Sequence, residues 1–393
     1  MRTCLQCLCP VAATLLATAP FQTAAALAGN PIVVAVPARA GAVTGTRQNS
    51  DEFIWRLFIQ FVSPVGGRDP SRVVFETWAS DNDTFSKQPV WPQPDQPKRF
   101  QASRLGLAAS PDNGIIDVAC NPPKVPGLAS FPHGDSDELC IAEEVRRNRP
   151  MFDYIVGNQL NTRAGLAAAY ARSFDVQMPT NAVAVKGDWI PVQTLLKWIP
   201  QIGSLDNLRT LYHTGTSGGV EYGLVSLHVS SRQNTNWVWG TFEHELTPGR
   251  CDDIGCCDSF GATRKTVRPN NKQINSQYGR CHKTAKLKAM MKSAGISPVW
   301  DHYCLKSTQV DYMDPSGLPS VLGNSVIERL AGNGTVAASS CITCHSYASF
   351  DASGTTSSNV VGILPYNPTG RPIPDIMKGS LRFDFMWGVL GAP

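Results

Sequence analysis

Charge is scarce in this sequence. Only 17% of its 393 residues are charged, and the formal net charge is +4. Nucleic-acid-binding proteins usually concentrate basic residues in a patch, so these numbers argue against that class. Disorder requires low hydrophobicity together with high charge, whereas 42% of these residues are hydrophobic. We therefore expect the chain to fold around a packed core.

Long apolar runs and the common cofactor motifs are also missing. Beyond the N-terminal stretch, no run of about 18 apolar residues predicts a membrane helix. The sequence has no G-x-G-x-x-G after a strand, no P-loop, no H-E-x-x-H and no Ser-His-Asp hydrolase signature. Nothing therefore marks a nucleotide cofactor or names a substrate, and no nucleic-acid partner is expected.

Residues 1–28 have the pattern of a secretory signal peptide. Arg2 supplies the positive n-region, "VAATLLATAPF" forms a short apolar h-region, and the small residues up to Ala28 offer a cleavage site. A buried helix or an anchor is the alternative, but the apolar run is short and Ala-rich for a bilayer span. We expect a periplasmic or secreted protein, with no membrane span after signal removal and a flexible arm over residues 29–50.

The cysteines fit export to an oxidising compartment. Three of the twelve fall in the signal peptide, which leaves nine, and most of these should pair. If Cys341 and Cys344 serve another purpose, seven remain for three disulfides and one odd thiol. Cys120 and Cys140 could form a local bridge, although connectivity cannot be read from sequence. The other two bridges would come from Cys251, Cys256, Cys257, Cys281 and Cys304.

The stretch "SSCITCHSYASF" places Cys341, Cys344 and His345 in the spacing Cys-x-x-Cys-His. Three chemistries compete for this spacing: covalent haem attachment, a redox-active disulfide and part of a zinc site. The disulfide alternative expects a thioredoxin-like βαβ unit, and the tail after the motif shows no such alternation. Zinc needs a second ligand pair. The groups available for that pair are Cys281 with His282, or Cys251 with Cys256 and Cys257. In an exported chain, these cysteines more often form disulfides.

We therefore favour one covalent haem c. Two sulfurs would bond the macrocycle on one side, and the turn between them and the histidine would bring His345 under the iron as proximal ligand. Cys341 and Cys344 are the predicted attachment residues. For the sixth ligand we predict Met377, because Pro374 and Gly379 mark a loop that could fold over the ring. Met386, an upstream histidine or an open position are the alternatives, and core packing explains either methionine equally well.

A β-hairpin is predicted from residues 222–230 and 237–246, two strand-like stretches separated by "SRQNTN". Pairing across this loop places His228 opposite Trp239 and puts Glu243 on the same polar face. A His–Glu pair near a haem edge could move protons or hold a polar substrate. The alternative is that the histidines are structural. The predicted catalytic residues are His228, Glu243 and His244, the last on the apolar face of the hairpin.

The fold class expected from these patterns is α+β. A mixed domain containing a β-sheet would span residues 51–317, and a short, mostly helical or loop haem-binding segment would span residues 318–393. This segment is short for an independent cytochrome fold, so we expect the hairpin to cover one face of the haem. Helices are predicted over 51–62, over 140–173 with a break at Pro150, over 284–295 and over 320–332, and further strands over 72–80 and 181–192.

Several stretches occur in an order that resembles a known group of proteins. They are "DEFIWRLFIQFVSP", "VVFETWAS", "YGLVSLHVS", "WVWGTFEHEL", "SSCITCHSYASF" and "LRFDFMWGV". The chain is similar, as islands between about residues 51 and 390, to uncharacterised bacterial exported cytochrome c family proteins with one C-terminal CxxCH and a W-x-W-x-T-F-E-H segment. The chain departs from that pattern at "FIQFVSP" and "FEHELT". The resemblance implies haem and export but no known reaction.

The predicted function is a periplasmic mono-haem c-type cytochrome with electron-transfer capacity, the redox part of an oxidoreductase acting on an unidentified substrate. A simple carrier needs only about 100 residues to wrap one haem, so the upstream residues need another role. One alternative is a pure electron-transfer protein that docks a redox partner through its N-terminal domain. The other is a haem-based ligand-binding or sensor protein.

Overall fold

The computed structural model describes most of the chain beyond the N-terminal stretch. Outside the described residues lie the predicted signal peptide, nearly all of the predicted arm, and the expected Cys120–Cys140 bridge. In the part that the structure describes, no helix is both long and apolar enough to cross a bilayer. The described residues are 48–65, 72–93, 101–102, 142–270, 276–326, 328, 339–363 and 368–393.

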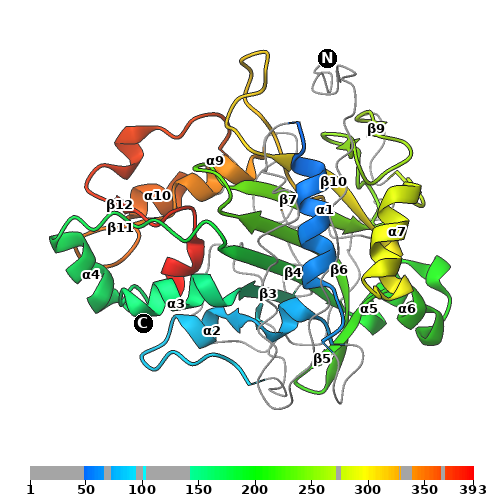
Figure 1. Ribbon diagram of the computed structural model, residues 1–393, viewed down its shortest axis with the longest axis horizontal. Helices are drawn as coiled ribbons and strands as arrows, with labels where there is room; N and C mark the ends of the chain where they lie inside the picture. Colours follow the sequence, from blue (N-terminus) through cyan, green and yellow to red (C-terminus); the bar gives the residue numbers. More distant parts are fainter. Residues whose placement is uncertain are drawn as a thin grey trace, which may run out of the picture.

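An antiparallel sheet of eight strands forms the centre of the molecule (Figure 1). Its strand order is β1-β3-β4-β6-β7-β10, with β2 paired to β3 and β5 paired to β6. Two smaller sheets pair β8 with β9 and β11 with β12. The strands are β1 (Ala79–Ser80), β2 (Gln101–Ala102), β3 (Ala142–Arg147), β4 (Val183–Pro191), β5 (Thr214–Ser217), β6 (Val220–Ser231), β7 (Val238–His244), β8 (Cys256–Cys257), β9 (Thr266–Val267), β10 (Tyr303–Gln309), β11 (Ser349–Phe350) and β12 (Leu381–Arg382).

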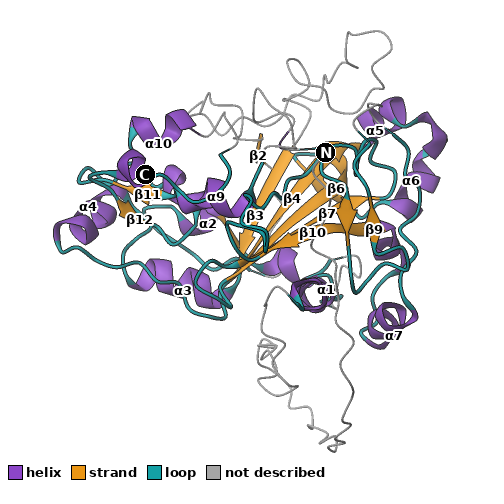
Figure 2. Cartoon of the chain, turned by 90° about the horizontal axis from the view of Figure 1, so that it is seen from above, coloured by secondary structure: helices purple, strands orange, loops and turns teal. Residues whose placement is uncertain are grey.

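The helices gather at the two ends of this sheet and on one of its faces. Figure 2 shows α3, α4 and the C-terminal elements at one end, and α5, α6 and α7 at the other. Helices beside an antiparallel sheet make the fold α+β, as predicted. The helices are α1 (Ser50–Phe61), α2 (Asp81–Thr84), α3 (Arg149–Gly157), α4 (Arg163–Ala171), α5 (Val192–Trp198), α6 (Leu205–Leu211), α7 (Ala285–Ser293), α9 (Cys341–Ser346) and α10 (Ser358–Ile363).

Helix α1 packs its apolar side against the central strands, which confirms the helix predicted over residues 51–62. Phe58 and Trp55 contact Phe242 of β7, with ring centroids 4.5 and 4.9 Å apart. The helix approaches closely at Gly240, where an added Cβ would lie 2.6 Å from Ile54 Cγ2. The core on this face of the sheet is therefore aromatic and tightly packed.

The predicted hairpin is present as β6 and β7, with a register two residues away from the predicted one. His228 pairs with Thr241, and Ser231 closes the ladder against Val238. The loop is closed by Trp237, which has a φ of 60° and donates its backbone N–H to Asn234. Because the shift is even, every side chain stays on its predicted face.

Two predicted elements, the helix over residues 140–173 and the strand over residues 72–80, are confirmed only in part. Residues 142–147 form strand β3 between β1 and β4, and the helix begins only after Asn148, whose side chain caps Met151 N–H at 3.4 Å. Pro150 therefore lies in the first turn of α3 instead of interrupting a longer helix. Within residues 72–80, Val74–Thr77 form a 3₁₀ turn, in which buried Glu76 accepts the backbone N–H of Val73 at 3.0 Å, and only Ala79–Ser80 form a strand, β1.

The segment before the Cys-x-x-Cys-His motif also differs from its prediction. Of the helix expected over residues 320–332, the described residues 320–326 form no helix, whereas the described Glu328 is helical. Instead Leu322 pairs with Ser340 in a parallel bridge, and its carbonyl accepts the backbone N–H of Cys341 at 3.3 Å. This segment therefore runs beside the motif as an extended support.

A second core joins the two regions that the sequence divides at residue 317. Met151 of α3 and Leu166 of α4 cluster with Ile342, Phe350 and Phe383 from the C-terminal region. All five side chains are fully buried or nearly so. The predicted domain boundary stays a prediction, and this shared core crosses it.

Truncation of Phe242 should destabilise the fold strongly. Phe242→Ala removes the ring that α1 packs on, and large-to-small changes of buried aromatics cost about 3–5 kcal/mol. We expect the free energy of unfolding, measured by urea titration, to fall by about that amount. Val90→Ala, at a side chain 58% exposed, is the control and should change it by less than about 0.5 kcal/mol. Equal stability of both variants would contradict this account of the core.

Candidate functional site

The motif lies on helix α9, and strand β10 holds the first turn of this helix. Ser340 is the N-cap residue and accepts the backbone N–H of Thr343 at 3.4 Å. Gln309 of β10 donates its side-chain amide to Ser340 Oγ at 2.8 Å and accepts the backbone N–H of Ile342 at 3.0 Å. The central sheet therefore fixes the position of the motif directly.

The thiols of Cys341 and Cys344 are not joined to each other or to another described cysteine. Cys341 donates to the backbone carbonyl of Leu322, with sulfur and oxygen 3.4 Å apart. Burial raises the pKa of both thiols, that of Cys344 to about 12. Redox-active dithiols depend on a lowered thiol pKa, because the thiolate is the nucleophile. These thiols therefore fit the disulfide alternative poorly.

His345 is held by one ring nitrogen. Its Nδ1 lies 2.8 Å from the backbone carbonyl of Phe385, so Nδ1 carries the proton and donates it. Burial lowers the pKa of His345 to about 4, so the ring is neutral near pH 7. In the described part of the chain Nε2 has no hydrogen-bond partner. This nitrogen is therefore able to bind a metal.

The carbonyl that orients His345 comes from an unusual backbone conformation. Asp384 and Phe385 have φ angles of 40° and 68°, in a region that non-glycine residues seldom adopt. The Asp384 carboxylate accepts hydrogen bonds from the backbone N–H of Met178 at 2.6 Å and from Trp237 Nε1 at 3.1 Å. Contacts from distant parts of the chain thus hold the strained pair in place.

The hairpin reaches the motif through Trp239. Its ring lies 4.6 Å from that of His345, measured between centroids, at an angle of 45°. Trp239 Nε1 donates to the carbonyl of Asn236 at 2.9 Å, which fixes the indole. The hairpin therefore lies beside His345. That it covers one face of a haem stays a prediction.

The sheet face opposite α1 carries a polar strip that faces the C-terminal region. Its side chains alternate with the apolar ones under α1, as the period of two requires. On this face His228 neighbours Lys186 on one side and Thr241 on the other. We define the polar strip as Lys186, Asp188, Ser226, His228, Thr241, Glu243 and Lys306.

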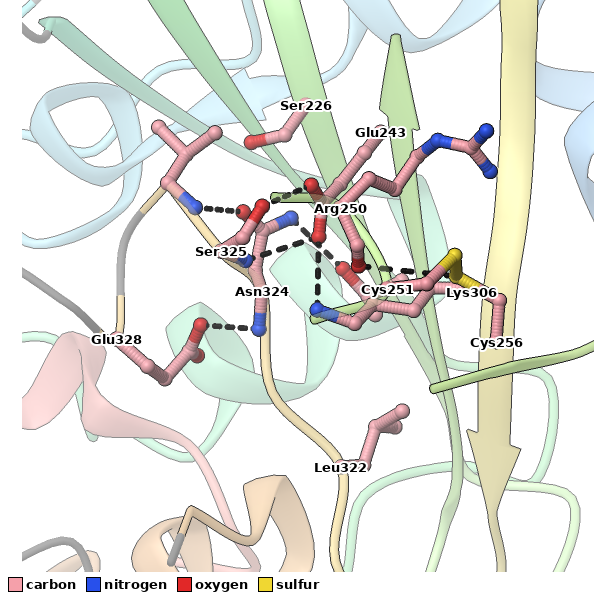
Figure 3. Close-up of polar contacts among 12 residues, drawn as sticks. Ser226, Glu243, Arg250, Cys251, Cys256, Lys306, Leu322, Asn324, Ser325 and Glu328 are labelled. Carbon is pink, nitrogen blue, oxygen red and sulfur yellow. Dashed lines mark hydrogen bonds and ion pairs between the residues drawn. A yellow bond between two sulfur atoms is a disulfide. The ribbon is translucent and has the colours of Figure 1, made fainter. Parts of the chain in front are cut away.

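Glu243 in this strip is a structural anchor (Figure 3). The carboxylate is fully buried, lies 3.1 Å from Lys306 Nζ, and accepts both the backbone N–H of Ser325, at 2.9 Å, and its hydroxyl. Next to it Asn324 donates to Thr241 Oγ1 at 3.0 Å. The predicted catalytic residue Glu243 thus uses its oxygens to attach residues 324–326 to the sheet.

His228 lies at the end of the strip that faces the motif. Its Nε2 is 3.5 Å from Asp188 Oδ2, and Asp188 in turn accepts the hydroxyl of Ser226. Ligand atoms of His228, Glu328 and Cys341 all lie within 4.8 Å of one another. Burial by itself lowers the pKa of His228, but Asp188 and the charge of Glu328 outweigh it and raise the pKa overall. The carboxylates therefore favour positive charge here, as a proton or as a metal ion.

His244 lies on the opposite face of β7. Its Nδ1 accepts the backbone N–H of Leu246 at 3.2 Å, and its Nε2 donates to the carbonyl of Leu211 at 3.1 Å. Its ring stacks on Tyr212 with centroids 3.6 Å apart, and burial lowers its pKa well below the usual value. The structure therefore separates His244 from His228, and its contacts are those of a structural histidine.

The two candidate methionines pack in apolar clusters. Met377 lies with Tyr347 and Val360, and Met386 lies in the cluster that contains Trp239 and Ile342. Both side chains are buried. Met377 as iron ligand stays a prediction, and its present contacts are those of a core residue.

Two disulfides remove the zinc alternatives considered from the sequence. Cys251 pairs with Cys256, and Cys281 pairs with Cys304. Both bridges come from the five cysteines predicted to supply two, and oxidised sulfurs are not zinc ligands. A second ligand pair built on Cys281 or Cys251 is therefore excluded.

Sequence reasoning missed Lys186, Asp188 and Glu328. The first two alternate on β4 with apolar residues, a pattern that predicts a shared face but not the strand opposite. No sequence pattern around Glu328 indicates that it lies near His228. Its position there depends on how residues 324–326 attach to the sheet. Only the antiparallel pairing of β4 with β6 brings Lys186 beside His228.

Comparison with protein-family models, with curated proteins and with solved structures found no match for this chain. Function is therefore argued from the geometry and chemistry of the site.

Removal of the charge on Glu243 should destabilise the protein more than removal of the whole ion pair. Glu243→Gln leaves Lys306 buried without its counter-ion, and such a change costs about 3–5 kcal/mol. The double variant Glu243→Gln, Lys306→Met removes both charges and should regain part of that loss. Urea unfolding of the two variants and the wild type measures the difference. A single variant as stable as the wild type would contradict the anchoring role of Glu243.

His244 should make stability depend on pH. In the unfolded chain it titrates near its usual pKa of about 6.5, while in the folded protein it stays neutral to a much lower pH. Below about pH 6.5 the unfolded state binds more protons, so the free energy of unfolding decreases as the pH falls toward the folded-state pKa. His244→Gln should flatten this decrease in urea unfolding curves. Tyr212→Phe keeps the stacked ring and should retain the slope; equal slopes in all three proteins would refute the assignment.

Proposed function

We propose that this protein is a periplasmic mono-haem c-type cytochrome with electron-transfer capacity. The observation that carries the proposal is the state of the motif on α9. Cys341 and Cys344 are unbridged thiols in a chain that bridges other cysteines, and His345 has one nitrogen fixed by Phe385 and the other available. A covalent haem needs these three groups in this condition.

The residues present fit a haem. Cys341 and Cys344 would hold it through thioethers, and neutral His345 would ligate the iron through Nε2. The hydrogen bond from Nδ1 to a backbone carbonyl is the usual means of setting the tautomer and the orientation of a metal-bound imidazole. The haem, when bound, supplies reversible one-electron oxidation and reduction.

The residues around the motif have roles of their own. The Trp239 ring lies against His345, and the backbone carbonyl of Phe385 accepts the hydrogen bond from its Nδ1. Lys186 of the polar strip forms an ion pair with Glu143, and both side chains are partly or largely buried. The sheet therefore places charged groups near the motif in a partly buried setting. Burial and local charge are the means by which a protein adjusts the potential of a haem.

The part of the chain before the motif favours a role beyond simple electron carriage. The central sheet has its own aromatic core, which is more than one haem requires. We propose that the chain is the redox part of an oxidoreductase with an unidentified small-molecule substrate. Docking of a redox partner protein through this region and haem-based ligand sensing are the alternatives. A signal peptide at residues 1–28 would deliver the chain to the compartment where haem c is attached.

A metal ion without haem is the second candidate. His228, Glu328 and Cys341 offer nitrogen, oxygen and sulfur ligands within 4.8 Å of one another. This ligand set suits zinc or another thiophilic divalent ion. Elemental analysis of the purified protein separates this candidate from haem, because each predicts a different metal.

Covalent haem should depend on both motif cysteines. We expect the exported protein, made with a cytochrome c maturation system, to give a pyridine haemochrome spectrum of haem c and a mass increased by one haem. Cys341→Ala with Cys344→Ala should abolish covalent haem, since both thioethers are lost.

Cys251→Ala with Cys256→Ala is the matched control, because it also removes two cysteines but leaves the motif intact. It should retain haem c. A wild-type protein without haem after export with maturation would overturn the proposal, and zinc in its place would support the second candidate.

A further inference from the structure

We propose that His228 is the second protein ligand of the haem iron, opposite His345. This inference rests on the proposed attachment of haem at Cys341 and Cys344. It names one residue for a position that the motif itself leaves open, and it decides what kind of chemistry the haem can perform.

Proximity to the attachment point is the first argument. One ring nitrogen of His228 lies within 4.8 Å of Cys341 Sγ. The haem would be bonded to this sulfur, so His228 lies close to where the macrocycle would be held. His228 lies on strand β6 and His345 on helix α9. The two imidazoles therefore come from separate elements, and each could approach the iron independently.

The unsatisfied ring of His228 is the second argument. Among the described residues, neither of its ring nitrogens makes a hydrogen bond, and Nε2 is buried without a partner. The nearest carboxylate is that of Asp188, 3.5 Å from Nε2, and Asp188 is fully buried and held by Ser226. A buried imidazole without hydrogen bonds requires a partner, and an iron ion would supply one.

The other described histidines are engaged elsewhere. His213 is 2.8 Å from Glu76, and His302 is 2.8 Å from Glu245. His244 has both nitrogens in hydrogen bonds on the far face of β7. His282 is exposed near the disulfide of Cys281. Among the described residues, His228 is the imidazole left beside the motif.

The methionines fit the position less well. Met386 is buried in the apolar cluster that contains Trp239 and Ile342. Met377 packs with Tyr347 and Val360 in an apolar cluster of its own. Either one would have to leave its core position to reach the iron.

Two histidine ligands have a functional consequence. Both axial positions would be filled by the protein, which favours electron transfer over direct reaction of a small molecule at the iron. Replacement of histidine by methionine at an axial position raises the reduction potential of a cytochrome c. A His228→Met variant that binds through sulfur should therefore have a higher potential than the wild type.

The test uses the exported haem-loaded protein. A pyridine haemochrome assay first establishes covalent haem, and electron paramagnetic resonance and near-infrared magnetic circular dichroism then identify the axial ligands of the oxidised wild type. These measurements need no mutation, so they stand even if a variant fails to fold. We expect the low-spin signature of two imidazoles.

Variants then assign the ligand to one residue. His228→Ala should become high-spin and bind carbon monoxide or azide, and added imidazole should restore the low-spin spectrum. His302→Gln, which alters a histidine paired with Glu245, is the control and should keep the wild-type spectrum.

Several results would overturn the inference. They are a His/Met signature or a high-spin spectrum in the wild type, and a His228→Ala variant that stays low-spin without added ligand. The haemochrome separates this failure from that of the proposed function. With haem present, only the ligand assignment falls; with haem absent, the proposed function and this assignment fall together.

Discussion

The buried ion pair of Glu243 and Lys306 connects the two halves of this structure. Both side chains are withdrawn from water, where unpaired charges would be costly, so each requires the other. The carboxylate also binds the backbone N–H and hydroxyl of Ser325, which attaches residues 324–326 to the sheet. From there the extended segment at Leu322 runs beside the start of α9. The position of the motif therefore depends on a charge pair in the sheet.

The sheet divides its faces between stability and chemistry. The face under α1 is filled by aromatic side chains such as Phe242, which supply the large apolar burial that a fold needs. The opposite face carries the charged and hydrogen-bonding groups of the polar strip, among them His228 with a buried, unsatisfied Nε2, and α9 lies beside them. An apolar face and a polar face on the same strands let one framework both stabilise the molecule and position the Cys-x-x-Cys-His motif, because successive side chains alternate.

The sequence predicted what depends on local pattern. Helical spacing predicted α1, and alternation predicted β4. Two strand-favouring stretches around a short polar loop predicted β6 and β7, and the period of two put His228 and Glu243 on one face despite the shifted register. It did not predict β3, because residues 143–147, four of them charged around Val145, become a strand only between two partners. Nor did it predict that His228 lies near Cys341. The two residues are 113 positions apart in the chain, and local sequence patterns do not indicate contacts between such distant residues.

The anchoring of the Asp384–Phe385 carbonyl has a consequence for the order in which the protein forms. Asp384 is held by Trp237 and Met178, which precede it by 147 and 206 residues. Contacts of such separation close large loops and therefore form late in folding. Until the sheet exists, the segment that carries the motif has nothing to dock on, and its thiols remain accessible to solvent. Covalent chemistry at these cysteines is thus easiest on a newly made, partly folded chain.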